Sequence, residues 1–285
     1  MSKYPKKIKI VEVGPRDGLQ NEKKIVSTDD KVRFIDLLSE SGLSVIEAGS
    51  FVHPKWVPQL ADTAEVYQKI SKKVGVTYPV LVPNKKGLER ALEVGVKDIA
   101  VFTAASESFN KKNINRSIQE SLNDIQTIVT EAKAHQLGVR GYVSTCFICP
   151  YEGKIAPEKV VPVVEALLHM GIDEISLGDT IGSAVPADVE KLLNLLLKNI
   201  PPEKLAVHFH DTKKNALANI EVSLQLGITI IDSSAGGLGG CPYAPGASGN
   251  VATEEVLTML HGMGIETGVN LDKIVTASRW LANVL

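Results

Sequence analysis

The sequence predicts an α/β protein that folds as a single (β/α)8 TIM barrel, with one extra helix at its C-terminal end. Strand-like apolar runs alternate with amphipathic, helix-like stretches along the whole chain. Eight such runs can be counted, and eight parallel strands close a barrel of this type. The length of 285 residues is typical of such a barrel built as one unit. No linker or change of composition divides the chain, so residues 1–285 are predicted to form one domain.

The predicted strands are short apolar runs that end in polar residues or glycine. They comprise residues 8–14, 44–50, 76–83, 98–104, 139–146, 174–180, 205–211 and 228–234. Several segments between them begin with Ser, Thr or Asp and end with Gly, as helices tend to do; STDDKVRFIDLLSESG (residues 27–42) is one example. The last segment, LDKIVTASRWLANVL (residues 271–285), is predicted to be the additional helix on the outside of the barrel.

An open, doubly wound sheet is the alternative to a closed barrel. It would have fewer strands, and a glycine-rich phosphate-binding loop would follow the first strand. Here the first strand is followed instead by GPRDGLQNE (residues 14–22). The sequence therefore favours the closed barrel.

The composition excludes several classes of partner. The net charge is −2 and 44% of the residues are hydrophobic, so neither a nucleic acid nor an anionic membrane is expected as a partner. No apolar stretch approaches the roughly 20 residues that span a bilayer, and no leader pattern follows the basic N-terminus. We expect a cytoplasmic protein. Cys146 and Cys149 form a CxxC without a second pair, which favours ordinary strand-end cysteines over a zinc or redox site.

Polar side chains gather at the ends of the predicted strands. In a TIM barrel the carboxyl ends of all strands meet at one rim, where the active site lies. The residues at that rim come from five strands: Arg16, Asp17, Glu47, Ser50, Ser176, Asp179, His208, His210, Asp211 and, in a glycine-rich loop after the last strand, Cys241. This convergence predicts an active site at the rim.

Two of these residues, His208 and His210, suggest a metal site. Side chains two residues apart on a strand point to the same side, so both imidazoles would face the barrel axis. Asp17 can supply an anionic ligand and Asn250 an amide oxygen. Nitrogen and oxygen ligands of this kind suit Mg²⁺ or Mn²⁺, with Zn²⁺ as the competitor. Paired core histidines bonded to carbonyls are the alternative interpretation.

Five motifs stand out along the chain: GPRDGLQNE (residues 14–22), SFVHPKWVPQ (50–59), SLGDTIG (176–182), HFHDT (208–212) and GGLGGCPYAPGASGN (236–250). Together they resemble the 3-hydroxy-3-methylglutaryl-CoA lyase family, one of the metal-dependent lyases and Claisen synthases built on TIM barrels. The Arg-Asp and HxH elements are shared across the larger group. The glycine-rich loop with its cysteine is specific to the lyases.

The resemblance implies a role for each matching residue. Asp17, His208, His210 and Asn250 would bind Mg²⁺ or Mn²⁺. Arg16 and Cys241 would be catalytic together with His208, and Glu47 and Asp179 would support the site. The predicted substrate-binding residues are Arg16, Gln20, Ser50 and Ser176. The partner would be an acyl-CoA, the assembly a homodimer and the pathway leucine breakdown.

The implied reaction is the cleavage of (S)-3-hydroxy-3-methylglutaryl-CoA to acetyl-CoA and acetoacetate. A metal-bound tertiary alcohol must lose its proton, and either His208 or Asp17 could accept it. Arg16 suits the oxygen of the enolate that forms. Cys241, mostly protonated at neutral pH, suits the delivery of a proton to the enolate carbon.

Three other functions are compatible with parts of this pattern. They are a Claisen condensing enzyme, a sibling lyase or aldolase with another acyl-CoA or keto acid, and a metal-binding barrel without activity. The condensing enzymes usually carry an added regulatory domain, which this sequence does not show. The presence of Arg, Asp, HxH, Asn and Cys together argues against the inactive barrel.

Overall fold

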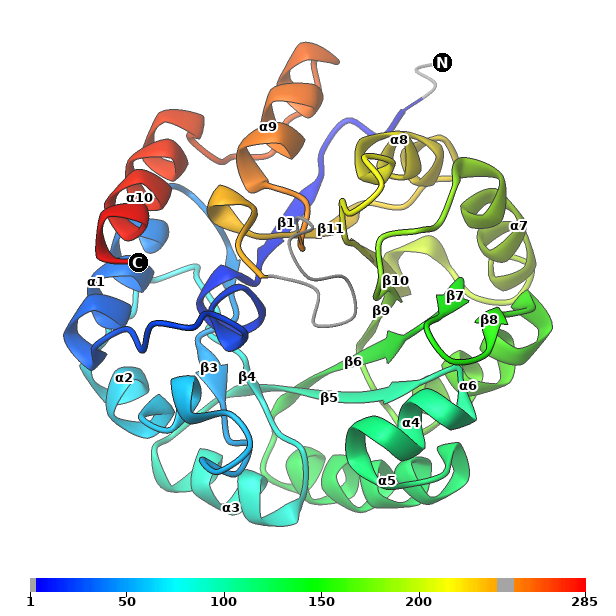
Figure 1. Ribbon diagram of the computed structural model, residues 1–285, viewed down its shortest axis with the longest axis horizontal. Helices are drawn as coiled ribbons and strands as arrows, with labels where there is room; N and C mark the ends of the chain where they lie inside the picture. Colours follow the sequence, from blue (N-terminus) through cyan, green and yellow to red (C-terminus); the bar gives the residue numbers. More distant parts are fainter. Residues whose placement is uncertain (1–3, 240–248) are drawn as a thin grey trace.

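The computed structural model describes residues 4–239 and 249–285, which form a closed parallel barrel surrounded by helices (Figure 1). Its sheet runs in the order β2-β1-β11-β10-β9-β6-β5-β4-β3, with every pairing parallel. The strands are β1 (Lys9–Glu12), β2 (Val45–Ile46), β3 (Gly49–Ser50), β4 (Val80–Leu81), β5 (Asp98–Ala104), β6 (Gly138–Ser144), β9 (Glu174–Asp179), β10 (Leu205–Phe209) and β11 (Ile230–Ser233).

The barrel closes because β2 and β3 are two parts of one predicted strand. They stand at the two ends of the sheet order, and only Glu47 and Ala48 separate them in the chain. β2 pairs with β1, whereas β3 pairs with β4. The barrel thus has eight strand positions, each overlapping one of the eight predicted segments; β6 begins one residue before its segment, at Gly138. The predicted (β/α)8 fold is confirmed.

Helices form the outer ring of the barrel (Figure 1). Their bounds are α1 (Thr28–Ser39), α2 (Thr63–Lys69), α3 (Lys85–Glu93), α4 (Glu107–Ile114), α5 (Ile118–Ala134), α6 (Pro157–His169), α7 (Pro186–Leu196), α8 (Ala216–Gln225), α9 (Thr253–Gly262) and α10 (Leu271–Val284). α10 is the predicted additional helix and packs against α1. No helix in the part of the chain that the structure describes is long and apolar enough to cross a membrane.

Shorter elements shape the ends of the barrel. The π-helical turn η1 (Gly14–Gly18) follows β1, and 3₁₀ turns form η2 (Pro58–Leu60), η3 (Pro202–Lys204) and η4 (Ala235–Gly237). β7 (Ile148–Cys149) and β8 (Gly153–Lys154) form an antiparallel hairpin after β6. η1 and η4 belong to the loops that carry the candidate site.

The two sides of each barrel strand face different surroundings. On β10, Leu205, Val207 and Phe209 pack into the large apolar core between sheet and helices. The alternate residues Ala206 and His208 therefore face the inside of the barrel. Because both sides are buried, the strands read as nearly continuous apolar runs in the sequence. The charged residues inside the barrel interrupt that pattern.

Cys146 and Cys149 are ordinary buried cysteines. Both are free thiols, and the thiol of Cys146 donates to the carbonyl oxygen of Val143 at 3.0 Å. Cys149 Sγ lies 3.0 Å from the hydroxyl of Ser106. Burial raises the pKa of Cys146 to about 12, so its thiol stays protonated and is unsuited to binding a metal.

Candidate metal centre and active site

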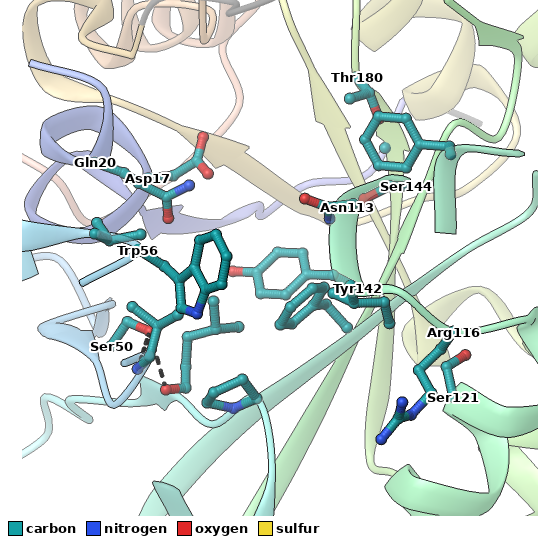
Figure 2. A pocket seen from close by; sticks show the side chains of 18 of the residues that line it. Asp17, Gln20, Ser50, Trp56, Asn113, Arg116, Ser121, Tyr142, Ser144 and Thr180 are labelled. Atoms are coloured by element: carbon teal, nitrogen blue, oxygen red, sulfur yellow. Dashed lines mark hydrogen bonds between the residues drawn. The ribbon is translucent and has the colours of Figure 1, made fainter. Parts of the chain in front are cut away.

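A cavity of about 790 Å³ opens at the carboxyl end of the barrel. Residues of seven strand positions, or of the loops that follow them, line it, which is the location expected for the active site of a TIM barrel. Figure 2 shows Asp17 and Gln20 on one side of the cavity, Arg116 and Ser121 on the other, and Tyr142 between them. The volume is sufficient for a ligand the size of a cofactor.

Asp17, His208 and His210 form a cluster at the inner end of this cavity. Their ligand atoms all lie within 4.8 Å of one another. Asp17 Oδ2 is 3.9 Å from His208 Nε2 and also 3.9 Å from His210 Nε2. β10 and the residue that follows it present the two imidazoles on one side, and η1 brings Asp17 towards them. Two imidazole nitrogens and a carboxylate fit a divalent cation.

Asn250 also reaches the cluster. Its amide nitrogen donates to Asp17 Oδ2 at 2.8 Å and to the carbonyl oxygen of Leu238 at 3.1 Å. Rotation of the amide about its terminal torsion would present the oxygen instead, as a metal ligand requires. Gly239 makes room for this amide: a Cβ there would lie 2.6 Å from Asn250 Nδ2, and its φ of +109° suits only glycine.

Arg16 lies beside the cluster as a fixed positive charge. It is 6% exposed, its Nε donates to Glu47 Oε2 at 2.7 Å and its Nη1 donates to Asp17. Its guanidinium carbon is 5.2 Å from the centre of the Tyr142 ring. Burial alone would lower the pKa of Arg16, but the carboxylates of Glu47 and Asp17 outweigh it and raise that pKa. Arg16 therefore remains charged at every pH that the protein meets.

Glu47 is fully buried and holds Arg16 in place. Its Oε2 accepts from Arg16 and also from the hydroxyl of Tyr142 at 3.1 Å, while its Oε1 has no partner among the described residues. Burial raises the pKa of Glu47 and the charge of Arg16 opposes that shift. The supporting role predicted for Glu47 stays a prediction; the structure shows its carboxylate bonded to Arg16 and Tyr142.

Burial and neighbouring charges set the electrostatics of the ligand cluster. Burial alone would raise the pKa of Asp17, but Arg16 and the two histidines hold it well below its usual range. Burial, with the neighbouring His208, lowers the pKa of His210 to about 4. At neutral pH the cluster thus combines a carboxylate with a neutral His210 imidazole, which are the forms that bind metal ions.

Asp232 lies behind His208 and was not anticipated from the sequence. Its Oδ2 is 3.1 Å from His208 Nδ1 and accepts from the Ser176 hydroxyl at 2.8 Å. Arg140 donates to both of its oxygens, Nη1 to Oδ2 at 3.0 Å and Nη2 to Oδ1 at 2.6 Å. A charged residue within an apolar strand is rare unless it is paired. The aspartate in ITIIDSS and the arginine in VRGYVS could have been noticed on that ground.

The predicted substrate-binding residues differ in their surroundings. Gln20 and Ser50 line the cavity, and the Ser50 hydroxyl donates to the carbonyl oxygen of Leu81 at 3.3 Å. Ser176 lies fully buried below the cavity, with its hydroxyl donated to Asp232.

Asp179 and Cys241 are the other two residues predicted to be catalytic. Asp179 is 1% exposed and accepts from the backbone N–H groups of Ser183 and Ala184, so it shapes the loop after β9. Cys241 belongs to residues 240–248, outside the described part of the chain.

The outer wall of the cavity contains residues that were not predicted to belong to the site. Trp56 lines it with 82% of its surface exposed. Lys112, near the end of α4, and Arg116, between α4 and α5, also line it. A large exposed aromatic residue beside a cavity often marks a binding surface. In the sequence, Lys112 and Arg116 are indistinguishable from ordinary surface positions, whereas Trp56 lies within the motif SFVHPKWVPQ.

Comparison with known proteins identifies similar chains. A sequence model of the family described as HMGL-like matches residues 7–281. The mitochondrial hydroxymethylglutaryl-CoA lyase of Macaca fascicularis is 56% identical over 285 residues, which cover 100% of this chain and 88% of that protein. The cytoplasmic 3-hydroxy-3-methylglutaryl-CoA lyase of Rattus norvegicus is 55% identical over 285 residues, covering 100% of this chain and 83% of the relative.

A solved structure of similar fold contains coenzyme A. It is an HMG-CoA lyase of Acinetobacter baumannii in complex with coenzyme A and 3-methylmalate, with a TM-score of 0.94 and 39% identity. The match covers 100% of this chain and 93% of that chain.

Proposed function

Because this chain belongs to the HMGL-like family, we propose that it cleaves (S)-3-hydroxy-3-methylglutaryl-CoA to acetyl-CoA and acetoacetate in a reaction that depends on a divalent metal ion. One observation of the site supports this most directly. The cluster of Asp17, His208 and His210 lies beside the permanently charged Arg16 at the inner end of a large cavity. This reaction needs a metal site and a fixed cation side by side.

We propose Mg²⁺ or Mn²⁺ as the ion, held by Asp17, His208, His210 and Asn250. A site made of nitrogen and oxygen ligands, without a thiolate, favours these ions over a structural Zn²⁺. Bound there, the ion would orient the substrate and lower the pKa of its tertiary alcohol. The proton of this alcohol would pass to Asp17 or to His208. Both side chains belong to the cluster.

We propose that Arg16 stabilises the enolate oxygen of the departing acetyl-CoA. Its hydrogen bonds to Glu47 and Asp17 fix the guanidinium before the reaction begins, so little reorganisation is needed as charge develops. Cys241 then delivers a proton to the enolate carbon. The glycines around it in GGLGGCPYAPGASGN support this assignment, because they permit a loop close to the substrate.

The outer wall of the cavity suits the coenzyme A arm of the substrate. Lys112 and Arg116 line it and carry the charge that its phosphates need. We propose that these two residues attract the phosphates; Lys213 and Lys214, in the loop after β10, are not among the residues that line the cavity. Replacing both Lys112 and Arg116 by alanine should raise KM for the coenzyme A thioester. The KM for the corresponding pantetheine thioester, which lacks the nucleotide, should hardly change.

The decisive experiment is an assay of purified protein. Acetoacetate should form from hydroxymethylglutaryl-CoA in the presence of Mg²⁺, stop after EDTA dialysis and return when Mg²⁺ or Mn²⁺ is added. Full turnover without metal would contradict the ligand assignment. Turnover of a 2-keto acid with acetyl-CoA, in place of this cleavage, would identify a condensing enzyme.

We further propose that residues 1–285 form one catalytic domain, that the protein is a homodimer and that it acts in the cytoplasm. The rat relative named as cytoplasmic supports the compartment, although the macaque relative is mitochondrial by name. Light scattering of the purified protein measures the oligomeric state, and a fluorescent fusion shows the compartment.

A further inference from the structure

His208 is the only one of the two cluster histidines with a carboxylate behind it among the described residues. Its Nδ1 lies 3.1 Å from Asp232 Oδ2, and its Nε2 points towards Asp17. His210 Nδ1 is buried and has no partner in the described part of the chain. The orientation of His208 is therefore determined by a hydrogen bond, whereas that of His210 depends on packing.

A chain of alternating charges inside the barrel holds Asp232. Arg140 donates to both carboxylate oxygens of Asp232 and, through Nε, to Glu174 at 2.6 Å. Lys9 in turn donates to Glu174. After the two Arg140 nitrogens, the Ser176 hydroxyl is a third donor to this carboxylate, at Oδ2. Asp232 is 1% exposed, so this network fixes the position of its carboxylate and also keeps it ionised.

An ionised, immobile carboxylate determines the proton position on a neighbouring imidazole. Asp232 can only accept, so His208 must carry a hydrogen on Nδ1. In the neutral imidazole, Nε2 is then left with a lone pair directed at Asp17. A carboxylate behind a histidine in this way commonly orients a metal ligand and raises its basicity.

We propose that Asp232 is a positioning residue, which holds His208 in the Nδ1–H form with Nε2 presented to the metal site, and that Arg140 and Ser176 hold Asp232. Ser176 then acts through Asp232 and not by touching the substrate. This inference rests on the metal site of the proposed function.

Asparagine at position 232 would reverse the hydrogen bond. Arg140 donates to both oxygens of Asp232, so the amide nitrogen would face an Arg140 donor at either place. That donor lies at 2.6 Å from the place of Oδ1 and at 3.0 Å from the place of Oδ2, which favours the nitrogen at the place of Oδ2. The Ser176 hydroxyl can rotate to accept from that nitrogen, and His208 can accept only by moving its hydrogen to Nε2. That form of His208 has no lone pair for a metal ion.

The test measures Mn²⁺ binding to metal-free protein by electron paramagnetic resonance, with no substrate present. Asp232→Asn should weaken binding about 10- to 100-fold. Glu174→Gln is the matched control, because it disturbs the same charge network without touching His208, and it should change the affinity less than threefold. Equal weakening by both variants, or an unchanged affinity in folded Asp232→Asn, would overturn the proposal.

The unaltered protein provides a second measurement that does not depend on a variant folding. Nitrogen-15 NMR of the imidazole rings in metal-free protein should show the hydrogen of His208 on Nδ1. A hydrogen on Nε2 would overturn the proposal even if the metal site is correct. Failure of the wild-type protein to bind Mn²⁺ would instead reject the metal site, and this inference with it.

Discussion

Replacement of Arg16 by methionine tests two effects of its charge, one on the rate of the reaction and one on the folding free energy of the protein. Methionine has a similar reach but no charge, so Glu47 would remain buried without its partner. Removing one partner of a buried ion pair typically costs about 3–5 kcal/mol of folding free energy. Loss of one preorganised donor to a developing oxyanion lowers turnover about 10²–10³-fold, and the loss of a full charge is expected to lower it further.

A second substitution distinguishes these two effects. Glu47→Gln in the Arg16→Met background removes the unpaired charge, and the hydroxyl of Tyr142, 3.1 Å from Glu47 Oε2, can still donate to the amide oxygen. The double variant should therefore recover much of the lost stability. Its turnover should stay as low as that of Arg16→Met, because the positive charge beside the enolate oxygen is still missing.

The assay compares the rate of acetoacetate formation, thermal unfolding and Mn²⁺ binding in the wild type and both variants. Metal binding should survive in both, because Asp17, His208 and His210 are unchanged. If the double variant turns over within tenfold of the wild type, the charge of Arg16 is not needed for the reaction. A change confined to KM would mean that Arg16 binds substrate without stabilising the transition state.

Three further predictions concern the rim of the barrel. Gly239→Ala should weaken Mn²⁺ binding about tenfold or more, because the new Cβ would lie 2.6 Å from Asn250 Nδ2. Gly264→Ala is the control, because Gly264 also has a positive φ, +71°, but no atom lies within 4 Å of the added Cβ. Equal losses of Mn²⁺ affinity in the two variants would refute the steric argument. Cys241→Ala should lower kcat strongly while Mn²⁺ binding persists, and near-normal turnover would show that another acid protonates the enolate. Burial raises the pKa of Asp179 to about 6, above its value in the unfolded chain, so the stability it contributes is present at low pH and is lost as the pH rises through 6. Relative to the wild type, the unfolding free energy of Asp179→Asn should therefore rise by about 2 kcal/mol between pH 4 and pH 8. Parallel pH curves for the two proteins would contradict this.

The strand pattern alone determined the barrel. Strands buried on both sides must be apolar along their length, and helices that cover them must be amphipathic, so the alternation of the two is visible in any such sequence. The location of Arg16, Asp17 and His208 at one rim also followed, because parallel strands all end on the same side. The spacing of His208 and His210 placed both on one side of a strand. These conclusions need only local periodicity and strand direction.

Only the tertiary structure decided which polar residues meet. Ser176 and Asp179 look equivalent in the sequence, yet they lie on opposite sides of β9, and only Ser176 contacts Asp232. Asp232 and Arg140 are 92 residues apart, and their pairing depends on how β6 and β11 are arranged around the closed barrel. Contacts across the inside of a barrel depend on the stagger of its strands. That stagger is set by the packing of the whole sheet, and no short stretch of sequence contains it.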